Sequence, residues 1–477
     1  MIPGSANSLL LASAAGAAGG GYQIERSLRF NSADSAYLSR TPASAGNRKT
    51  WTWAGWVKKS AISSAVYTLF GAWNGGATDL DYFRILYADN NLQISGGSTV
   101  YLLTTTIYRD ASAWYHVIVT ADTTSSTANN RLRVYVNGSE VTTFSTRNNQ
   151  AQNTDFAINS TVAHNIGRSS DAAGYLDGYL ADIHFIDGQA LTPGSFVELD
   201  GNGIWQPKAY SGSYGTNGFH LPFSDNSTAA ALGTDASPQG NTWAVNNISV
   251  AAGANNDSLV DSPTNYGTDA GAGAEVRGNY CTWGVMFSGA SGLSNGNLEA
   301  SVSASNAFGT ISVTSGKWYW EVVGTSLNDP YIGIMDSTFS SANSSSWTSQ
   351  ARAYRWTGDK YDGTSAGYGA TWNNGDVIGF ALDLDGDTLT FYKNGASQGV
   401  AFSSGLIGKE WKPFVYANSG YFTANFGNAP SPTPHPAASK RSARQTCSAL
   451  RSPQAAPTLA TAWLMGHSSI LMACQPQ

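Results

Sequence analysis

The chain has 477 residues, enough for two or three domains, and a net charge of −6. Its 52 glycines, 15 tryptophans and 23 tyrosines, with only 12% charged residues, indicate many short strands joined by tight turns and argue against long surface helices. The part expected to fold carries no cluster of Lys and Arg, so nucleic acid is excluded as an expected partner.

The cysteines, the hydropathy and the N-terminal residues further limit the kinds of protein that the chain can be. Cysteines 281, 447 and 474 form no Cys-x-x-Cys pair, which argues against a disulfide framework or a structural zinc site. No stretch is long enough to span a bilayer, so we expect a soluble chain without membrane insertion. Residues 1–21 are rich in Ala and Gly and are interpreted as a flexible lead, with a weak secretory signal as the alternative.

Alternating, aromatic runs begin at Tyr22 at the spacing of strands and turns. They include Thr50–Val57, Tyr67–Phe70, Tyr82–Ile85, Trp114–Val119, Leu132–Val136 and Gly178–Phe185. The pieces W-Y-H-V, R-V-Y-V-N-G, N-I-G-R and L-D-G-Y-L-A-D-I-H-F, with a closing L-T-P, resemble a laminin-G-like domain of the concanavalin A type. The resemblance covers about residues 22–223 and implies a two-sheet jelly roll that buries alternating apolar residues.

Residues 224–277 change in composition to Ser, Asn, Gly, Asp and Thr, with few strand-like runs. Pieces such as N-T-W at 241–243 and D-S-P-T-N at 261–265 are too patterned for a plain spacer. We therefore expect a structured connector between two domains.

The segment Asp376–Phe402 predicts three short antiparallel strands. Apolar residues alternate on both sides of an Asp-Gly step, and Asn394-Gly395 supplies a second tight turn. This segment, with G-K-W-Y-W-E-V at 316–322, Y-I-G-I at 331–334 and later K-P-F-V and N-F-G, resembles a SPRY (B30.2-like) domain over about residues 278–428. The resemblance implies a second β-sandwich that serves as a binding scaffold with variable loops.

The connector pieces and the opening Arg26–Asp34 resemble tailed-phage proteins that join these two domain types. That resemblance, and not the composition, implies a virion or tail-associated protein with other virion proteins as partners. Residues 429–477 then hold seven prolines, four Lys or Arg and no acidic residue. They are either a disordered basic tail or the product of a reading-frame shift near Ala429.

Two groups of carboxylates are candidate calcium ligands. Asp383, Asp385 and Asp387 form D-x-D-G-D, but the Gly and Glu positions of an EF-hand loop are not met, so we interpret them as a hairpin turn. Laminin-G-like jelly rolls often hold one Ca²⁺ on a sheet rim, and Asp177 and Asp182, or residues 79 and 81, could supply its carboxylates. The alternative is solvated loop charges and no cofactor. The six histidines are scattered and show no metal spacing.

Catalytic motifs are missing from the sequence. The E-x-D-x-x-E signature of jelly-roll glucanases is absent, and Glu25, Glu140 and Glu198 are isolated. The G-H-S at 466–468 lacks the second glycine of a serine-hydrolase elbow, and the glycines at 271–278 miss the dinucleotide-binding spacing. We therefore predict that the chain is not an enzyme.

The aromatic residues fall into two sets. Those in alternating strands are interpreted as core: Trp51, Trp53, Trp56, Trp114, Trp318 and Trp320. Those among Gly, Ser, Asn and Asp in loops have the surroundings of an adaptable recognition surface. This second set supplies the ligand-binding candidates: Trp73, Trp347, Trp356, Tyr361, Tyr368 and Trp372.

The expected fold class is all-β, with two antiparallel β-sandwich domains, a Gly/Ser/Asn-rich connector and an irregular tail. The expected function is non-catalytic recognition of a host-surface glycan or protein through loops at the sandwich rims. Homo-oligomerisation would strengthen weak single sites by multivalency. A purely structural virion component without a ligand is the first alternative, and a polysaccharide depolymerase is the second.

Overall fold

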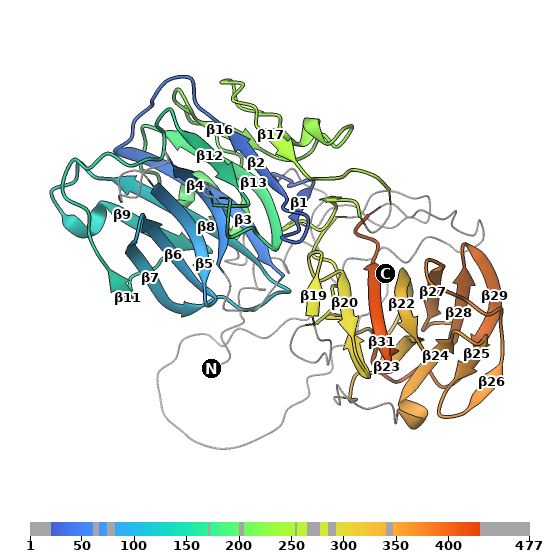
Figure 1. Ribbon diagram of the computed structural model, residues 1–477. Helices are drawn as coiled ribbons and strands as arrows, with labels where there is room; N and C mark the ends of the chain where they lie inside the picture. The colour runs from blue at the N-terminus through green and yellow to red at the C-terminus, as the bar shows by residue number, and fades with distance from the viewer. Residues whose placement is uncertain are drawn as a thin grey trace, which may run out of the picture.

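The computed structural model describes residues 21–60, 66–73, 82–169, 172–199, 205–252, 255–264, 277–284, 292–339 and 347–429. Within these ranges the chain forms antiparallel sheets and short 3-10 turns, which confirms the all-β class. The strands build two sandwiches that lie beside each other, the first in blue to green and the second in yellow to orange (Figure 1). The 3-10 turns are η3 (Ala128–Asn130), η4 (Pro193–Ser195), η5 (Ala230–Gly233) and η6 (Thr348–Gln350).

The first sandwich consists of two large sheets. Sheet I contains, in spatial order, β10 (Ser139–Glu140), β9 (Leu132–Val136), β8 (Trp114–Asp122), β3 (Thr50–Lys59), β13 (Gly178–Asp187), β1 (Ser27–Phe30) and β18 (Ser258–Leu259), with β16 (Phe219–Leu221) also paired to β13. Sheet II contains β11 (Phe144–Arg147), β7 (Thr99–Ile107), β6 (Asn91–Gly96), β5 (Tyr82–Ala88), β4 (Tyr67–Trp73), β12 (Ala163–Ile166), β2 (Tyr37–Arg40) and β17 (Ala244–Asn246). A small separate sheet pairs β14 (Val197–Leu199) with β15 (Trp205–Pro207).

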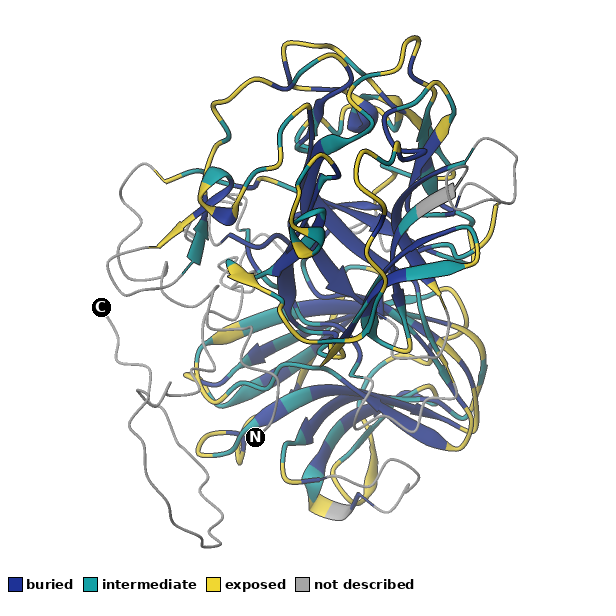
Figure 2. Cartoon of the chain, turned by 90° about the vertical axis from the view of Figure 1, so that its left-hand side faces the viewer, coloured by how far each residue is buried: buried dark blue, intermediate teal, exposed yellow. Residues whose placement is uncertain are grey.

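The core of the first sandwich is aromatic. Trp53 and Phe70, from facing sheets, are at most 1% exposed and stack with ring centroids 6.4 Å apart. Figure 2 shows the buried strands of both sandwiches in dark blue. The core interpretation is confirmed for five of the six strand tryptophans, while Trp318 is half-buried; the five are Trp51, Trp53, Trp56, Trp114 and Trp320.

The connector is built into the first sandwich. Its strand β17 extends sheet II through β2, and β18 extends sheet I through β1. Immediately before β17, Trp243 packs in the core, with its ring centroid 5.0 Å from that of Phe219. Residues that look like a spacer in composition therefore close one edge of each sheet.

The second sandwich also has two sheets. Sheet III contains β19 (Gly292–Ser294), β20 (Glu299–Val302), β31 (Ser419–Asn425), β22 (Lys317–Asn328), β27 (Val377–Asp383), β28 (Thr388–Lys393) and β29 (Ala396–Phe402). Sheet IV contains β21 (Ser305–Phe308), β30 (Trp411–Ala417), β23 (Tyr331–Asp336), β24 (Ala351–Arg355), β25 (Asp359–Tyr361) and β26 (Ser365–Gly367). The three strands predicted within Asp376–Phe402 are confirmed as β27, β28 and β29.

The acidic turn between β27 and β28 is a hydrogen-bonded structure. Asp383 accepts backbone N–H groups of the turn itself, and Asp385 accepts the N–H of Gly316. Asp387 accepts from Leu406 at 2.7 Å and from the two flanking N–H groups. These residues lie in the turn that connects β27 to β28, where Asp387 takes a left-handed φ of 53°, which confirms the turn interpretation.

A buried ion pair lies where the two sandwiches meet. Lys58, at the end of β3, lies 2.8 Å from the carboxylate of Asp261 in the connector, and both side chains are at most 1% exposed. The ammonium also donates to Oδ1 of Asn279 at 2.7 Å, and the Trp114 indole donates to Asp261 at 3.2 Å. These contacts form the joint between the sandwiches.

Apolar packing runs through the same joint. One buried cluster contains side chains of both sandwiches, among them Trp56, Trp114, Trp283 and Leu298. The Tyr179 hydroxyl donates to the carbonyl of Gly296 across the joint at 2.5 Å. Val260 donates to the carbonyl of Asn428 at 3.1 Å, which brings the end of the second sandwich back to the joint. The described part of the chain contains no helix that is long and apolar enough to cross a bilayer.

Candidate functional site

The end of the second sandwich that lies away from the joint carries exposed loops. Strand β22 passes the joint at Glu321, which pairs with Asn425, and ends at Asn328. At about 3.3 Å per residue, the seven steps from Glu321 to Asn328 place the end of the strand roughly 23 Å from the joint. The turn at Asp329 and the turn after β24 meet at this far end, which we call the Trp356 rim.

The Trp356 rim is held by one carboxylate. Asp329 occupies a left-handed turn, with φ of 49°, and its Oδ1 accepts from the Trp356 indole at 3.0 Å and from Arg355 at 2.8 Å. The Arg355 guanidinium in turn lies 5.1 Å from the ring of Tyr331. Trp356 is 40% exposed despite these contacts. The arrangement presents an aromatic face whose orientation is fixed before any ligand arrives.

A second ion pair lies in the adjoining loop. Asp376 accepts from Lys393 at 3.2 Å and from the side chain of Asn394 at 2.7 Å. Burial opposes its charged form, but the hydrogen bonds from Asn373, Asn394 and Lys393 lower the pKa of Asp376. The carboxylates of Asp329 and Asp376 are thus each paired with a cation.

The other aromatic candidates are less available. Trp347 and Trp372 are each 1% exposed, which corrects their assignment to a ligand-binding surface. Trp347 packs on the outer face of sheet IV, where its indole donates to Asn306 at 3.1 Å. The Ser, Asn and Gly residues around Trp347 and Trp372 are typical of loops. The two indoles are nevertheless buried, because burial of so large an apolar surface is favourable.

Tyr361 and Tyr368 are half-buried. Tyr361 is part of the aromatic group over sheet IV, with its ring centroid 5.8 Å from that of Trp347. The Tyr368 hydroxyl donates to the carbonyl of Gly399, and burial raises its pKa to about 12. Trp73 ends β4 and is half-buried on the first sandwich, so it does not join the Trp356 rim.

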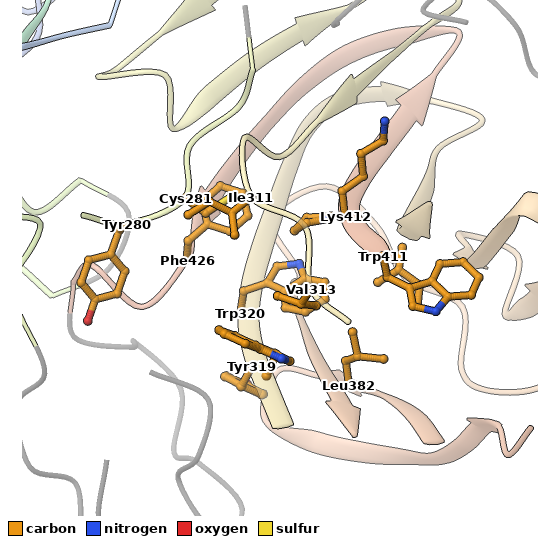
Figure 3. Close-up of a pocket in the computed structure, with 13 residues that line it drawn as sticks. Tyr280, Cys281, Ile311, Val313, Tyr319, Trp320, Leu382, Trp411, Lys412 and Phe426 are labelled. Atoms are coloured by element: carbon orange, nitrogen blue, oxygen red, sulfur yellow. The ribbon is translucent and has the colours of Figure 1, made fainter. Parts of the chain in front are cut away.

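A small cavity lies inside the second sandwich (Figure 3). Its lining is mainly aromatic and aliphatic, with Trp320, Leu382 and Trp411 from both sheets and Cys281 from the chain before them. Its volume of about 50 Å³ is well below the roughly 150 Å³ that admits benzene, so it cannot hold a sugar ring. Burial raises the pKa of Cys281 to about 11, which keeps the thiol protonated and unreactive at neutral pH.

A buried polar cluster lies on the first sandwich. The pairing of β13 with β3 shifts by one residue between Ala181 and His184, and Asp182 takes a left-handed φ of 49° at this bulge. Bulges re-aim side chains and are common beside functional sites. Antiparallel pairing of β13 with β16 then places His184 opposite His220. Asp182, His184 and His220 offer ligand atoms that all lie within 4.8 Å of one another.

Hydrogen bonds connect this Asp182 cluster. His220 Nε2 lies 2.7 Å from Oδ1 of Asp182, and His184 Nε2 lies 3.3 Å from Oδ2. The Tyr22 hydroxyl donates to Oδ1 at 2.7 Å. Burial opposes the charged carboxylate, yet the two imidazoles hold the pKa of Asp182 well below its usual range. Burial lowers the pKa of His184, while the nearby Asp182 carboxylate acts in the opposite direction.

The two predicted calcium ligands lie apart. Asp177 precedes β13 and is 6% exposed beside Ser60 and Gly296 at the joint, where burial raises its pKa to about 6. Asp182 lies five residues further along the strand, which is about 16 Å at 3.3 Å per residue. The two carboxylates therefore do not share a cation. Residues 79 and 81 lie outside the described residues.

The sequence interpretation missed the histidines of this cluster. His184 and His220 are 36 positions apart and show no metal spacing, which corrects the conclusion that the histidines are merely scattered. The signal that could have found them is D-x-H in a predicted strand, since residues two apart in a strand share one face. His220 could not be found in this way, because only strand pairing places it there.

Comparisons with known families agree with this architecture. A family model described as the SPRY domain matches residues 317–429. Another, described as the concanavalin A-like lectin/glucanases superfamily, matches residues 31–195. Both resemblances drawn from the sequence motifs are thereby confirmed, and together they indicate a binding or recognition role.

Two curated relatives resemble parts of the chain. "Ran-binding protein 9" of Xenopus tropicalis is 32% identical over 163 residues, which are 29% of this chain and 28% of that protein. "E3 ubiquitin-protein ligase RKP" of Arabidopsis thaliana is 29% identical over 109 residues, which are 22% of this chain and 8% of that protein. The chain thus spans less than a third of the length of these relatives.

Solved structures resemble parts of the chain as well. The SPRY domain of human HERC1 shares 23% identity, with 26% of this chain and 86% of that chain covered and a TM-score of 0.24. A heptameric SAP-like pentraxin from Limulus polyphemus shares 19% identity, with 36% of this chain and 80% of that chain covered and a TM-score of 0.26.

Proposed function

We propose that this chain is a non-catalytic recognition protein of a phage virion, associated with the tail, and that it binds a host-surface glycan or protein through the Trp356 rim. The observation that carries the proposal is the 40% exposed indole of Trp356, held in place by Asp329. An indole fixed in this way loses little conformational freedom when a ligand stacks on it. The virion setting depends on the resemblance of the opening segment and the connector to tailed-phage proteins.

The chemistry of the rim favours an uncharged or weakly charged ligand. The rim carboxylates Asp329 and Asp376 are already neutralised by Arg355 and Lys393. A sugar ring or an uncharged peptide segment can stack on the indole and hydrogen-bond to the surrounding Asn and Asp side chains. Single sites of this size bind weakly, so display of several copies on one particle would raise the overall affinity.

The names of the relatives favour a protein ligand over a glycan. One is named for binding Ran, and the other is named as a ubiquitin-protein ligase, which acts on proteins. The matched part is a minority of each of those proteins. It therefore supports protein recognition as a kind of activity and leaves the ligand to be identified.

The test is a binding assay with the full chain on host cells, with a glycan array in parallel. Saturable binding by the wild type that falls roughly 5-fold or more in Trp356→Ala is expected, because an aromatic anchor at a binding surface contributes more than about 1 kcal/mol. Tyr421→Ala is the matched control, since Tyr421 is an aromatic of similar exposure, 46%, on sheet III. Equal loss in both variants, or no loss in either, would refute the role of the rim.

The two alternatives give different results in the same experiment. A purely structural virion component would show no saturable binding to cells or glycans by the folded wild type. A depolymerase would release reducing ends from host polysaccharide. The second outcome requires a pair of carboxylates flanking a sugar, and such a pair is not found at the Trp356 rim, where Asp329 and Asp376 are each held in an ion pair.

A further inference from the structure

We propose that Asp182, His184 and His220 bind one divalent transition-metal ion of the zinc class, at a site separate from the Trp356 rim. The three ligand atoms lie within 4.8 Å of one another, and the residues are buried or nearly so. A metal at about 2.0–2.2 Å from imidazole nitrogen and carboxylate oxygen needs ligand atoms roughly 3–4 Å apart. The separations of 2.7 and 3.3 Å between the carboxylate and the two imidazoles approach that range.

The charge of the cluster supports a cation. Asp182 is 5% exposed, and within the described ranges its ion-pair partners are these two imidazoles, with no Lys or Arg among them. The Tyr22 hydroxyl also donates to this carboxylate and carries no charge. Buried carboxylates are generally paired with a cation or bound to a metal, because an isolated buried charge is costly. A metal ion held by these three residues would place a positive charge beside the buried carboxylate.

A contact at its other nitrogen orients the His184 imidazole as in known metal sites. Nδ1 of His184 lies 2.9 Å from the Tyr214 hydroxyl, which leaves Nε2 pointing at the carboxylate. Histidines that bind a metal through one nitrogen usually hydrogen-bond through the other, which fixes the tautomer. The buried His116 lies on the same side of the sheet, packed on Phe196 as His184 is, and its Nδ1 has no hydrogen-bond partner.

The arrangement of the rings indicates what must move. The rings of His184 and His220 stack with centroids 4.2 Å apart and an angle of 10° between their planes. Two imidazoles that share one metal must aim both Nε2 atoms at a single point, so at least one ring must tilt on binding. In the arrangement described, the Asp182 carboxylate accepts hydrogen bonds from both rings and stands where the metal would bind.

The ligand set determines the class of metal. Ca²⁺ prefers six to eight oxygen ligands, whereas two imidazoles and one carboxylate suit Zn²⁺, Co²⁺ and Ni²⁺. Tyr22, from the segment before β1, covers the carboxylate from one side. A metal in this place would connect that segment to β13 and β16, and its role would be to stabilise the first sandwich.

The experiment uses the full chain without an affinity tag, stripped with EDTA and returned to chelator-free buffer. Titration with ZnCl₂ by calorimetry should show one ion per chain, and Co²⁺ should give an absorption spectrum typical of nitrogen ligation. His220→Gln should weaken Zn²⁺ binding by at least ~100-fold, since loss of even an outer-shell partner costs 10–100-fold. His164→Gln is the control, because it removes another buried imidazole of the same sandwich.

Each outcome decides the proposal. Binding of one Zn²⁺ that His220→Gln loses and His164→Gln keeps would support it. Failure of the folded wild type to bind Zn²⁺ or Co²⁺, or equal affinity in the wild type and His220→Gln, would overturn it. Binding of Ca²⁺ in place of Zn²⁺ would also overturn it. If His220→Gln does not fold, the Co²⁺ spectrum of the wild type decides whether nitrogen ligands are present.

Discussion

Replacing Asp261 by asparagine should weaken the joint between the two sandwiches. The carboxylate lies 2.8 Å from Lys58 and accepts from Trp114, and both members of the ion pair are at most 1% exposed. Asparagine keeps the size and an acceptor for the indole, but it leaves the buried ammonium with only Asn279 and a carbonyl oxygen as partners. Removal of one member of a buried ion pair typically costs ~3–5 kcal/mol.

The expected shift in melting temperature depends on how the chain unfolds. If the sandwiches unfold together as roughly 400 residues, the unfolding entropy is about 0.85 kcal/mol/K, and a loss of ~3–5 kcal/mol lowers the melting temperature by about 4–6 °C. If the first sandwich of roughly 240 residues unfolds alone, the entropy is about 0.5 kcal/mol/K and the shift is about 6–10 °C. The apolar cluster shared across the joint favours the first case for the wild type.

Differential scanning calorimetry of the full chain measures both quantities. We expect one transition for the wild type, and a lower, split transition for Asp261→Asn. Glu140→Gln is the control, because the ion pair of Glu140 with Arg133 is exposed and long, at 3.7 Å, and such pairs contribute less than ~1 kcal/mol. An unchanged melting temperature in Asp261→Asn, or two independent transitions in the wild type, would refute the reasoning.

Four further variants test burial and charge. Asp177→Asn should raise the melting temperature at pH 8 but not at pH 4. Burial raises the pKa of Asp177 to about 6, so the folded state loses up to about 3 kcal/mol of stability as pH rises from 4 through 6. Equal shifts in melting temperature at both pH values would contradict this. In urea unfolding, Trp372→Ala should lower the free energy of unfolding by ~3–5 kcal/mol and Trp356→Ala by less than ~1 kcal/mol. The reason is that the indole of Trp372 is buried, whereas that of Trp356 is 40% exposed. Similar losses in the two variants would contradict the core position of Trp372. His164 accepts the N–H of Asn159 at 2.9 Å, and burial lowers the pKa of His164 to about 4. The stability that is present above pH 6.5 should therefore fall towards pH 4 in the wild type, and it should fall less in His164→Gln. Parallel curves of stability against pH in the two proteins would contradict this.

The sheets could be predicted from the sequence where the pattern is local. Strands β27 to β29 follow from period-two apolar residues and two Gly-containing turns within Asp376–Phe402. The joint could not be predicted, because Lys58 and Asp261 are 203 positions apart and each is an ordinary charged residue in the sequence. Local patterns determine strands, whereas the contacts between sheets depend on how distant strands pair.

The candidate sites divide in the same way. Trp356 was identified correctly as an exposed aromatic, while Trp347 and Trp372 have the same kind of neighbours in sequence and are buried. Composition describes a loop, but the direction of a single side chain depends on the sheet beneath it. The metal candidates show the same limit, since His220 reaches Asp182 only through the pairing of β16 with β13.

The layout of the second sandwich has a mechanical consequence. The Trp356 rim lies beyond Asn328 at the end of β22, and the joint, where Asn428 returns to Val260, lies near Glu321 of the same strand. Strands that run along this distance are stiff along their axes, and within the described residues one apolar cluster contains side chains of both sandwiches. A pull applied at Trp356 would therefore reach the first sandwich as a shearing force on the contacts that cross the joint, among them those of Lys58 with Asn279 and Tyr280. The second sandwich would act as a rigid lever between a surface that it grips and the body that carries it.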